Sequence, residues 1–290
     1  MSQHLADLLP VGGTTLGIRT WLKSFSYTRR LLLGESGNPW ESASQYLVYS
    51  SQAQGLLKPD VAVIEIGELF ESWLKQHPDV ATEMVGKRKL SYPLRKLLEQ
   101  TGPRALLAEI IGAVLVQLRG QVPLVLSMPS ARCWLYQASA MAGRELTEVD
   151  DGSVEDAAMY MADFLRAFSS FEVGGVLLDD TVQHDQSAKA DLSLYRPIMN
   201  VVKHYRWSLA FRMNSDGLVE NDALQEVDIF IGQQDLPPVG KAQGVDITPL
   251  LWEGVPLPEL LPHQFYFVDV PKDAKPETVL EKLSTIRIEN

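Results

Sequence analysis

Two adjacent carboxylates follow a short apolar run in the segment VGGVLLDDTVQHD, residues 173–185. Asp179 and Asp180 repel one another unless water, a cation or a hydrogen-bonding group surrounds them. Adjacent strand residues point to opposite faces, so one aspartate is expected to face a pocket and the other the helix layer or the next helix cap. His184 lies close behind, and an imidazole beside a carboxylate can carry a proton. These three residues are the candidate catalytic groups.

A second group of polar side chains interrupts apolar segments. Arg212 lies in SLAFRMNS (208–215), where an arginine needs an anion or water. It is expected either to clamp a substrate carboxylate or to form a structural ion pair with Asp179 or Asp180, and both roles are compatible. Glu65 interrupts VAVIEIG (61–67), which predicts an inward-facing group or a charge at a strand end.

The segment SMPSARCW (127–134) offers hydroxyls near a helix start. Ser127 and Ser130 could cradle an anion, although Ser130 is also a preferred helix N-cap. The candidate substrate-binding residues, each expected after one of the predicted strands, are Arg19, Glu65, Ser127, Ser130, Arg212, Asn214 and Gln233.

Short aliphatic runs alternate with longer helical patterns along the chain, which predicts parallel βαβ units. The lack of G-x-G-x-x-G and of G-x-x-x-x-G-K-[ST] disfavours a nucleotide-binding open sheet. We therefore expect a single-domain (β/α)₈ barrel over residues 1–290, with its site at the carboxyl ends of the strands. The expected strands are 14–19, 61–66, 123–128, 145–149, 175–178, 207–213, 227–231 and 265–270, and the expected helices are 39–57, 68–77, 103–119, 152–169, 192–205 and 276–286.

Two segments stand apart from this repeat. Residues 1–60 are interpreted as an N-terminal region of helices and the first strand. The polar, basic stretch 77–101 lies between the second and third expected strands and is predicted to be an insertion near the barrel mouth.

Composition narrows the function. The net charge is −11 and the pI is about 5.0, which argues against nucleic acids and anionic membranes as partners. One cysteine, Cys133, excludes an internal disulfide or a multi-cysteine zinc site, and with no signal peptide expected at the N-terminus it indicates the cytoplasm. No cofactor is predicted and no metal ligands are assigned. A divalent ion on Glu65, Asp179, Asp180 and His184 stays open, because their spacing matches no specific metal pattern.

Three stretches resemble the uroporphyrinogen decarboxylase and cobalamin-independent methionine synthase superfamily of TIM barrels. They are PLVLSMPSARCWLYQAS (123–139), GGVLLDDT (174–181) and FVDVPKDAKPETVLEKLSTI (267–286). The likeness is one of layout from about residue 60 onward. The decarboxylase arginine signature is missing, with only Arg19 in its place, and so is the methyltransferase His-x-Cys zinc motif.

The resemblance implies an enzyme that acts on a small carboxylate-bearing organic molecule by decarboxylation or by transfer of a one-carbon or methyl group. Asp179 or Asp180 would carry the proton and Arg212 would hold the carboxylate. Related barrels often dimerise, so a homodimer is one expected arrangement. The alternatives are a metal-dependent carbon–carbon lyase and a catalytically silent barrel that only binds a ligand.

Overall fold

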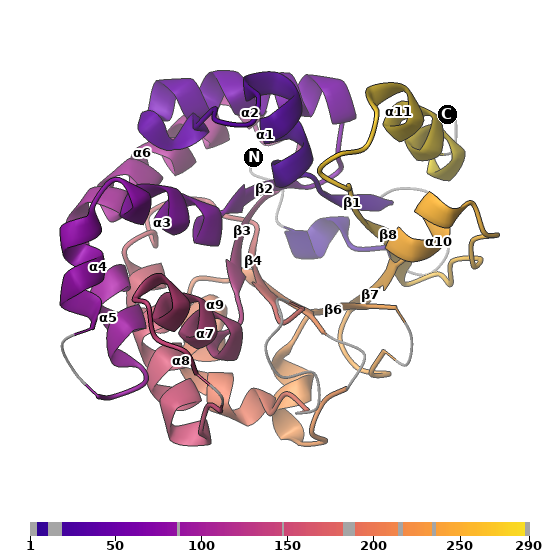
Figure 1. Cartoon of the computed structure of the whole chain (residues 1–290). Helices are drawn as coiled ribbons and strands as arrows, with labels where there is room; N and C mark the ends of the chain where they lie inside the picture. The colour runs from indigo at the N-terminus through magenta and orange to yellow at the C-terminus, as the bar shows by residue number, and fades with distance from the viewer. Residues whose placement is uncertain are drawn as a thin grey trace.

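Eight parallel strands form a nearly closed barrel surrounded by helices, which confirms the predicted (β/α)₈ fold (Figure 1). The computed structural model describes residues 5–10, 19–85, 88–146, 148–181, 189–213, 217–233 and 236–287. The strands are β1 (Thr20–Lys23), β2 (Ala62–Glu65), β3 (Leu124–Pro129), β4 (Gly175–Asp179), β5 (Ser208–Arg212), β6 (Ile229–Gly232), β7 (Ala242–Asp246) and β8 (Gln264–Asp269).

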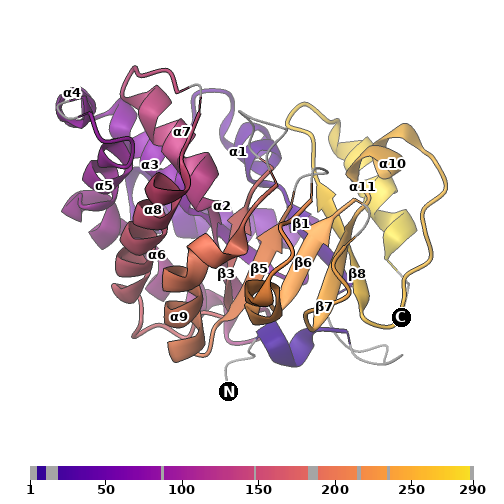
Figure 2. The same ribbon diagram turned by 90° about the horizontal axis from the view of Figure 1, so that it is seen from below.

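The α-helices cover much of the outside of the barrel, whereas in Figure 2 no α-helix lies in front of β6 and β7. The chain runs from β6 to β7 without an α-helix among its described residues, and the residues of β7 are alternately buried and partly exposed. The α-helices are α1 (Phe25–Leu33), α2 (Ala43–Leu57), α3 (Ile66–Lys75), α4 (Pro78–Met84), α5 (Tyr92–Leu98), α6 (Thr101–Leu118), α7 (Ala131–Met141), α8 (Asp151–Arg166), α9 (Arg196–His204), α10 (Thr248–Glu253) and α11 (Pro276–Ile286). Short 3₁₀ helices add Leu5–Leu8, Pro39–Glu41, Leu192–Tyr195 and Asp222–Glu226.

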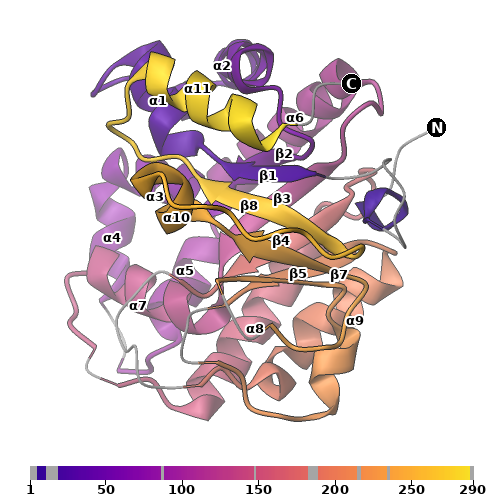
Figure 3. The same cartoon turned by 90° about the vertical axis from the view of Figure 1, so that its right-hand side faces the viewer.

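The hydrogen-bonded ladder runs in the order β1-β8-β7-β6-β5-β4-β3-β2, so β1 and β2 meet at a seam without a ladder between them. Figure 3 shows β8 alongside β1 with α11 above them. The Asp60 carboxylate closes one end of the seam by accepting from the backbone N–H groups of Arg19 and Thr20, both at 2.9 Å. Stacked rings of Trp40 and Tyr46, with centroids 4.5 Å apart, pack outside the seam.

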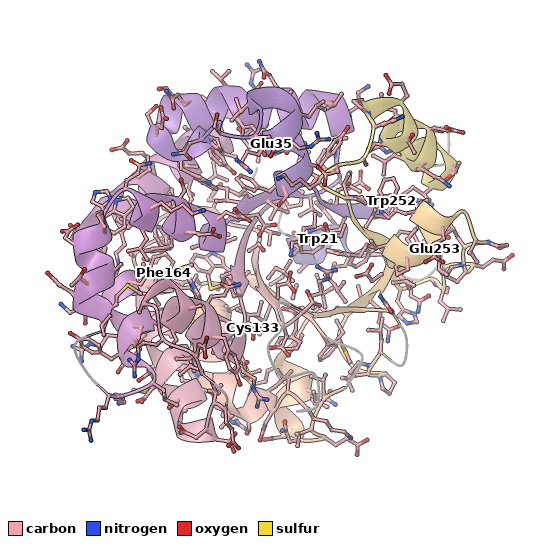
Figure 4. The ribbon with its side chains drawn as sticks, viewed as in Figure 1. Trp21, Glu35, Cys133, Phe164, Trp252 and Glu253 are labelled. Atoms are coloured by element: carbon pink, nitrogen blue, oxygen red, sulfur yellow. The ribbon has the colours of Figure 1, made fainter. Side chains whose placement is uncertain are left out.

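The barrel interior is apolar from the amino ends of the strands to their middle. Trp21 lies at the centre of the barrel, and its ring stacks on Phe265 with centroids 6.1 Å apart (Figure 4). Inward residues alternate with outward ones, as the strand period requires. Leu5 belongs to the same cluster, so the first 3₁₀ helix closes the barrel at the amino ends of the strands. The core therefore leaves only the carboxyl ends free for polar side chains.

The strand boundaries correct several predictions. The first strand begins at Thr20 rather than at residue 14, and residues 11–18 lie outside the described part of the chain. The expected strand at 145–149 is wrong, because its described residues carry no strand. β7 was not predicted, since the segment AQGVD mixes glycine and polar residues with its apolar ones. These two errors cancel in the count of eight.

The segment 77–101 forms α4 and α5, together with the start of α6. α5 packs against α7 and α8 on the outer wall (Figure 1). No described residue of this segment lines the cavity at the mouth. The segment adds helices to the outer wall, and its role as an insertion near the mouth stays a prediction.

α6 is the one helix in the described ranges that is long and apolar enough to cross a membrane, with a hydropathy of 1.3. It packs against α2 and α3 as part of the barrel wall, and a single helix of this kind is weak evidence for a membrane span. The arrangement is therefore consistent with a soluble protein.

Candidate active site at the carboxyl ends of the strands

A lysine and an aspartate form an ion pair at the floor of the barrel mouth. Lys23 is the last residue of β1, and its Nζ lies 2.6 Å from Oδ2 of Asp179, the last residue of β4. The Asp179 side chain is 4% exposed and the Lys23 side chain 28% exposed, so the cation faces the opening. Although burial alone would raise it, Lys23 and Arg212 hold the pKa of Asp179 well below its usual range. Asp179 is therefore a fixed anion, and not a proton carrier near neutral pH.

Lys23 is a fixed cation for the complementary reason. Burial disfavours its charge, but Asp179 and Glu65 together raise the pKa of the Lys23 ammonium above its ordinary value. An ammonium held in the protonated form cannot act as an amine nucleophile, but it can stabilise negative charge that develops on a bound molecule.

Arg212 is enclosed by three carboxylates. Its Nη2 lies 2.9 Å from Asp246, and its Nη1 lies 3.3 Å from Asp179 and 3.5 Å from Asp269. The guanidinium also stacks over the ring of Phe267, 4.5 Å from its centroid. With 9% of its side chain exposed, Arg212 is buried and does not line the mouth cavity. Among the described residues its Nε has no hydrogen-bond partner. The structural ion pair is the arrangement found, and the carboxylate clamp stays a prediction.

The two buried aspartates that hold Arg212, Asp179 and Asp246, each accept hydrogen bonds from a threonine two residues further along the chain. Oδ1 of Asp179 accepts from the N–H of Thr181 at 3.0 Å and from its hydroxyl at 2.5 Å. Oδ1 of Asp246 accepts from the N–H and hydroxyl of Thr248 at the same two distances. Each Asp-x-Thr turn leaves Oδ2 aimed at the arginine, which fixes the geometry of the pair.

Glu65 and Asp269 are the groups suited to move protons. Burial raises the pKa of Glu65, a shift that Lys23 and Ser127 only partly offset. Burial likewise raises the pKa of Asp269, opposed by Lys23 and Arg212. A carboxyl group with a raised pKa can hold a proton nearer to neutral pH and then donate it.

Asp180 points away from the mouth, toward the helix layer. Its Oδ1 accepts a short hydrogen bond from the hydroxyl of Ser130 and lies 3.7 Å from the thiol of Cys133. Burial raises the pKa of the Asp180 carboxyl. Of the two adjacent aspartates, Asp179 therefore faces the barrel mouth, and Asp180, expected as a catalytic candidate, belongs to the wall behind it.

The remaining predicted residues divide into those at the mouth and those elsewhere. Ser127 lines the mouth cavity next to Glu65, its partner in the strand register. Ser130 is the buried N-cap of α7, since its Oγ accepts from the N–H of Cys133 at 3.2 Å. Arg19 precedes β1 and lies at the opposite end of the barrel, because the strand starts later than predicted. Gln233 follows β6 as an exposed residue. His184 and Asn214 lie outside the described residues.

A cavity of about 270 Å³ opens above these groups. Its lining comes from the ends of β1, β2, β3, β4 and β8 and from the first turns of α1 and α3, which is where barrel enzymes bind their substrates. The volume suits a small organic molecule. The functional lining residues are Lys23, Glu65, Glu68, Ser127, Asp179 and Asp269.

Sequence reasoning missed Lys23 and Asp246. Lys23 was not predicted because the first strand was expected at 14–19, which made Arg19 its last residue, whereas β1 ends at Lys23. Asp246 was not predicted because β7 was not predicted. The Asp-x-Thr pattern nevertheless occurs twice in the sequence, as DDT (179–181) and DIT (246–248). Within the described ranges, no three histidine, cysteine or acidic side chains form a group that could hold a metal ion.

The chain matches no protein-family model, and no curated protein matches it. The fold and the mouth geometry thus define the class of protein, a (β/α)₈ barrel with a lysine-centred polar site. The resemblance to the decarboxylase and methionine synthase superfamily stays a prediction.

Proposed function

We propose that this protein is an enzyme that decarboxylates a small carboxylate-bearing organic molecule, or transfers a one-carbon unit from it, at the mouth of the barrel. The observation that carries the proposal is the Lys23 ammonium, held 2.6 Å from Asp179 and beside Glu65 in the mouth cavity. A fixed cation next to a carboxyl group of raised pKa is the pair that carbanion chemistry requires.

The chemistry follows from these two groups. When the bond to the departing carboxylate breaks, carbon dioxide leaves and the electron pair stays on the substrate carbon. Lys23 stabilises this negative charge because burial and Asp179 keep it in place without reorganisation. Protonated Glu65 then donates its proton to the carbon and recovers one from solvent. Asp269, 38% exposed at the rim, is a second group that can exchange protons with solvent.

This assignment changes the roles predicted from sequence. Asp179 positions Lys23 instead of carrying the proton, and Asp180 does not reach the mouth. The positive charge among Asp179, Glu65 and Asp269 comes from Lys23, so the proposed reaction needs no metal ion. We place the protein in the cytoplasm, with small molecules as its partners and a homodimer as its proposed assembly.

The test is a panel of small mono- and dicarboxylic acids, with carbon dioxide release and products followed by NMR. Lys23→Met and Glu65→Gln should each lower turnover by about 100-fold or more, the usual contribution of a positioned proton donor or fixed charge. Lys241→Met, at the amino end of β7, and Glu109→Gln, exposed on α6, are matched controls. Full turnover in both site variants would refute the proposal, and ligand binding without turnover across the panel would favour a silent barrel.

The pH profile gives an independent check. Since the active form of Glu65 is protonated and its pKa is raised, the rate should fall as the pH rises through that raised pKa. Glu65→Gln should lose this limb of the profile.

A further inference from the structure

A second cavity adjoins the mouth. It has a volume of about 490 Å³ and lies between the first turns of α1, the turn that follows α1, and α3. Ser26, Glu68 and Glu71 line both cavities, so the two spaces adjoin at these side chains. A molecule that is seated against Lys23 and Glu65 and extends outward past Glu68 would reach this outer groove.

Arg29 is a preorganised guanidinium in the wall of the outer groove. Its Nη1 donates to the backbone carbonyls of Glu35 and Gly37, at 3.2 and 3.1 Å, which fixes the plane of the side chain. Within the described ranges, Nε and Nη2 donate to no acceptor and no carboxylate lies within ion-pair distance. These three N–H donors form the edge that binds a planar oxyanion in two parallel hydrogen bonds.

The charges differ between the two cavities. The inner cavity and its boundary combine one cation, Lys23, with the acids Glu65, Glu68, Glu71, Asp179 and Asp269. The outer groove is lined by the cations Arg29, Lys75 and Lys272 and by the acids Glu35, Glu68 and Glu71, of which the last two also line the inner cavity. Lys75 is paired with Glu71 and Lys272 with Glu35, so Arg29 is the cation of this lining that no described carboxylate pairs. The anionic group of an elongated ligand therefore meets favourable charge where it reaches Arg29.

Arg212, near the centre of the barrel, is enclosed by three aspartates and lines neither cavity. Lys23 faces the inner cavity, where the proposed reaction uses it. Lys272 is paired with Glu35 at 2.9 Å, but both side chains are largely exposed, so a ligand can displace this contact at little cost.

We propose that the outer groove is a subsite for a distal oxyanion of the substrate, a carboxylate or a phosphate, with Arg29 as its anchor and Lys272 beside it. The subsite depends on the proposed function in one respect, which is that the molecule spanning both cavities is the substrate of the proposed reaction. It makes the substrate an elongated, doubly functional molecule, with the reacting end at Lys23 and an anionic end at Arg29. Arg29 is then a specificity-determining residue.

Binding is measured without turnover, by titration calorimetry at pH 7 and constant ionic strength, with glutarate and with inorganic phosphate as probes. Arg29→Met should weaken binding of the preferred probe by about tenfold or more, the usual worth of a charge-assisted bidentate contact. Arg29→Lys keeps the charge but loses the fork, so it should weaken binding by less. Arg166→Met is the control, since Arg166 is exposed on α8 and pairs only with Asp163.

The two probes separate the sources of the oxyanion. Binding of glutarate alone indicates a dicarboxylate substrate, and binding of phosphate alone a phosphorylated one. Thermal melts check that Arg29→Met folds. If it does not fold, the weaker oxyanion binding expected of Arg29→Lys and Lys272→Met tests the subsite instead. Binding that is equal in wild type and in the Arg29 variants, or no binding of either probe, would overturn the subsite.

This inference and the proposed function fail in different ways. Lys23→Met should keep oxyanion binding at Arg29, because Lys23 does not line the outer groove. Oxyanion binding through Arg29 with no turnover on any acid refutes the proposed function alone. Turnover of a substrate whose affinity is independent of Arg29 refutes the subsite alone.

Discussion

Replacing each of the two adjacent aspartates by asparagine compares two neighbouring carboxylates with opposite roles. Asp179→Asn keeps the oxygen that accepts from Thr181 but removes the charge that faces Lys23 and Arg212. Asp180→Asn keeps an acceptor for Ser130 and removes a charge that burial already disfavours. The first change should therefore destabilise the protein and the second should not.

The magnitude follows from burial. Removing one partner of a fully buried ion pair costs about 3–5 kcal/mol. The Asp179 side chain is 4% exposed, but Lys23 is partly solvated and Arg212 keeps Asp246. We therefore expect a loss of about 3 kcal/mol for Asp179→Asn. Asp180→Asn should change the free energy of unfolding by less than about 1 kcal/mol.

Urea unfolding followed by tryptophan fluorescence at pH 7 and pH 5 measures both variants. The folded-state pKa of Asp179 is lowered, so its stabilisation is fully present above the unfolded-state pKa of about 3.9 and disappears as the pH falls through the folded-state value. The gap between the variants should thus persist at pH 5 and close only in stronger acid. Equal stabilities at pH 7, or a larger loss for Asp180→Asn, would show that the assignment of the two carboxylates is wrong.

Three further predictions follow from single sites. Glu65→Gln should raise the thermal midpoint at pH 8, because the raised pKa means that the folded state disfavours the Glu65 carboxylate, and the gain should vanish below the unfolded-state pKa of about 4.3. The Cys133 thiol should resist Ellman's reagent at pH 8 until the chain unfolds, because burial raises its pKa. Gly175→Ala should cost about 1–3 kcal/mol in urea unfolding, since its methyl group would lie 2.7 Å from the Ser208 carbonyl oxygen, whereas Gly55→Ala on exposed α2 should gain about 0.5–1 kcal/mol.

The barrel could be predicted from sequence because its strands are strongly patterned. VAVIEI (61–66) contains β2, and FYFVDV (265–270) includes all of β8 except its first residue, Gln264, since both strands consist mostly of apolar residues that form a clear run. The same reasoning placed the first strand too early. TTLGIR (14–19) has the composition of a strand, but β1 is TWLK (20–23), and its functional residue is the terminal lysine, Lys23. β7 contains a glycine and a glutamine, so nothing in its apolar content marks it as a strand.

The site was predictable only in part, for a related reason. Asp179, Glu65 and Ser127 could be found because each ends or interrupts an apolar run. Their partners depend on register across the barrel, as with Lys23 opposite Asp269 on neighbouring strands. Whether Arg212 serves a ligand or a structural network depends on three aspartates from three different strands, and a single sequence does not bring these together.

The seam between β1 and β2 has a consequence for how the chain reaches its final state. Because β1 has a ladder with β8 alone, Thr20 must wait for Tyr266, 246 residues further along the chain. At ribosomal rates of about 5–20 residues per second, that delay is roughly 10–50 s. Until β8 is made, the edge of β1 lacks the partner strand of its ladder, and an unpaired strand edge is a site where other chains can pair. Ring closure by these two strands therefore completes the barrel and places Lys23 beside Asp179 in the same step.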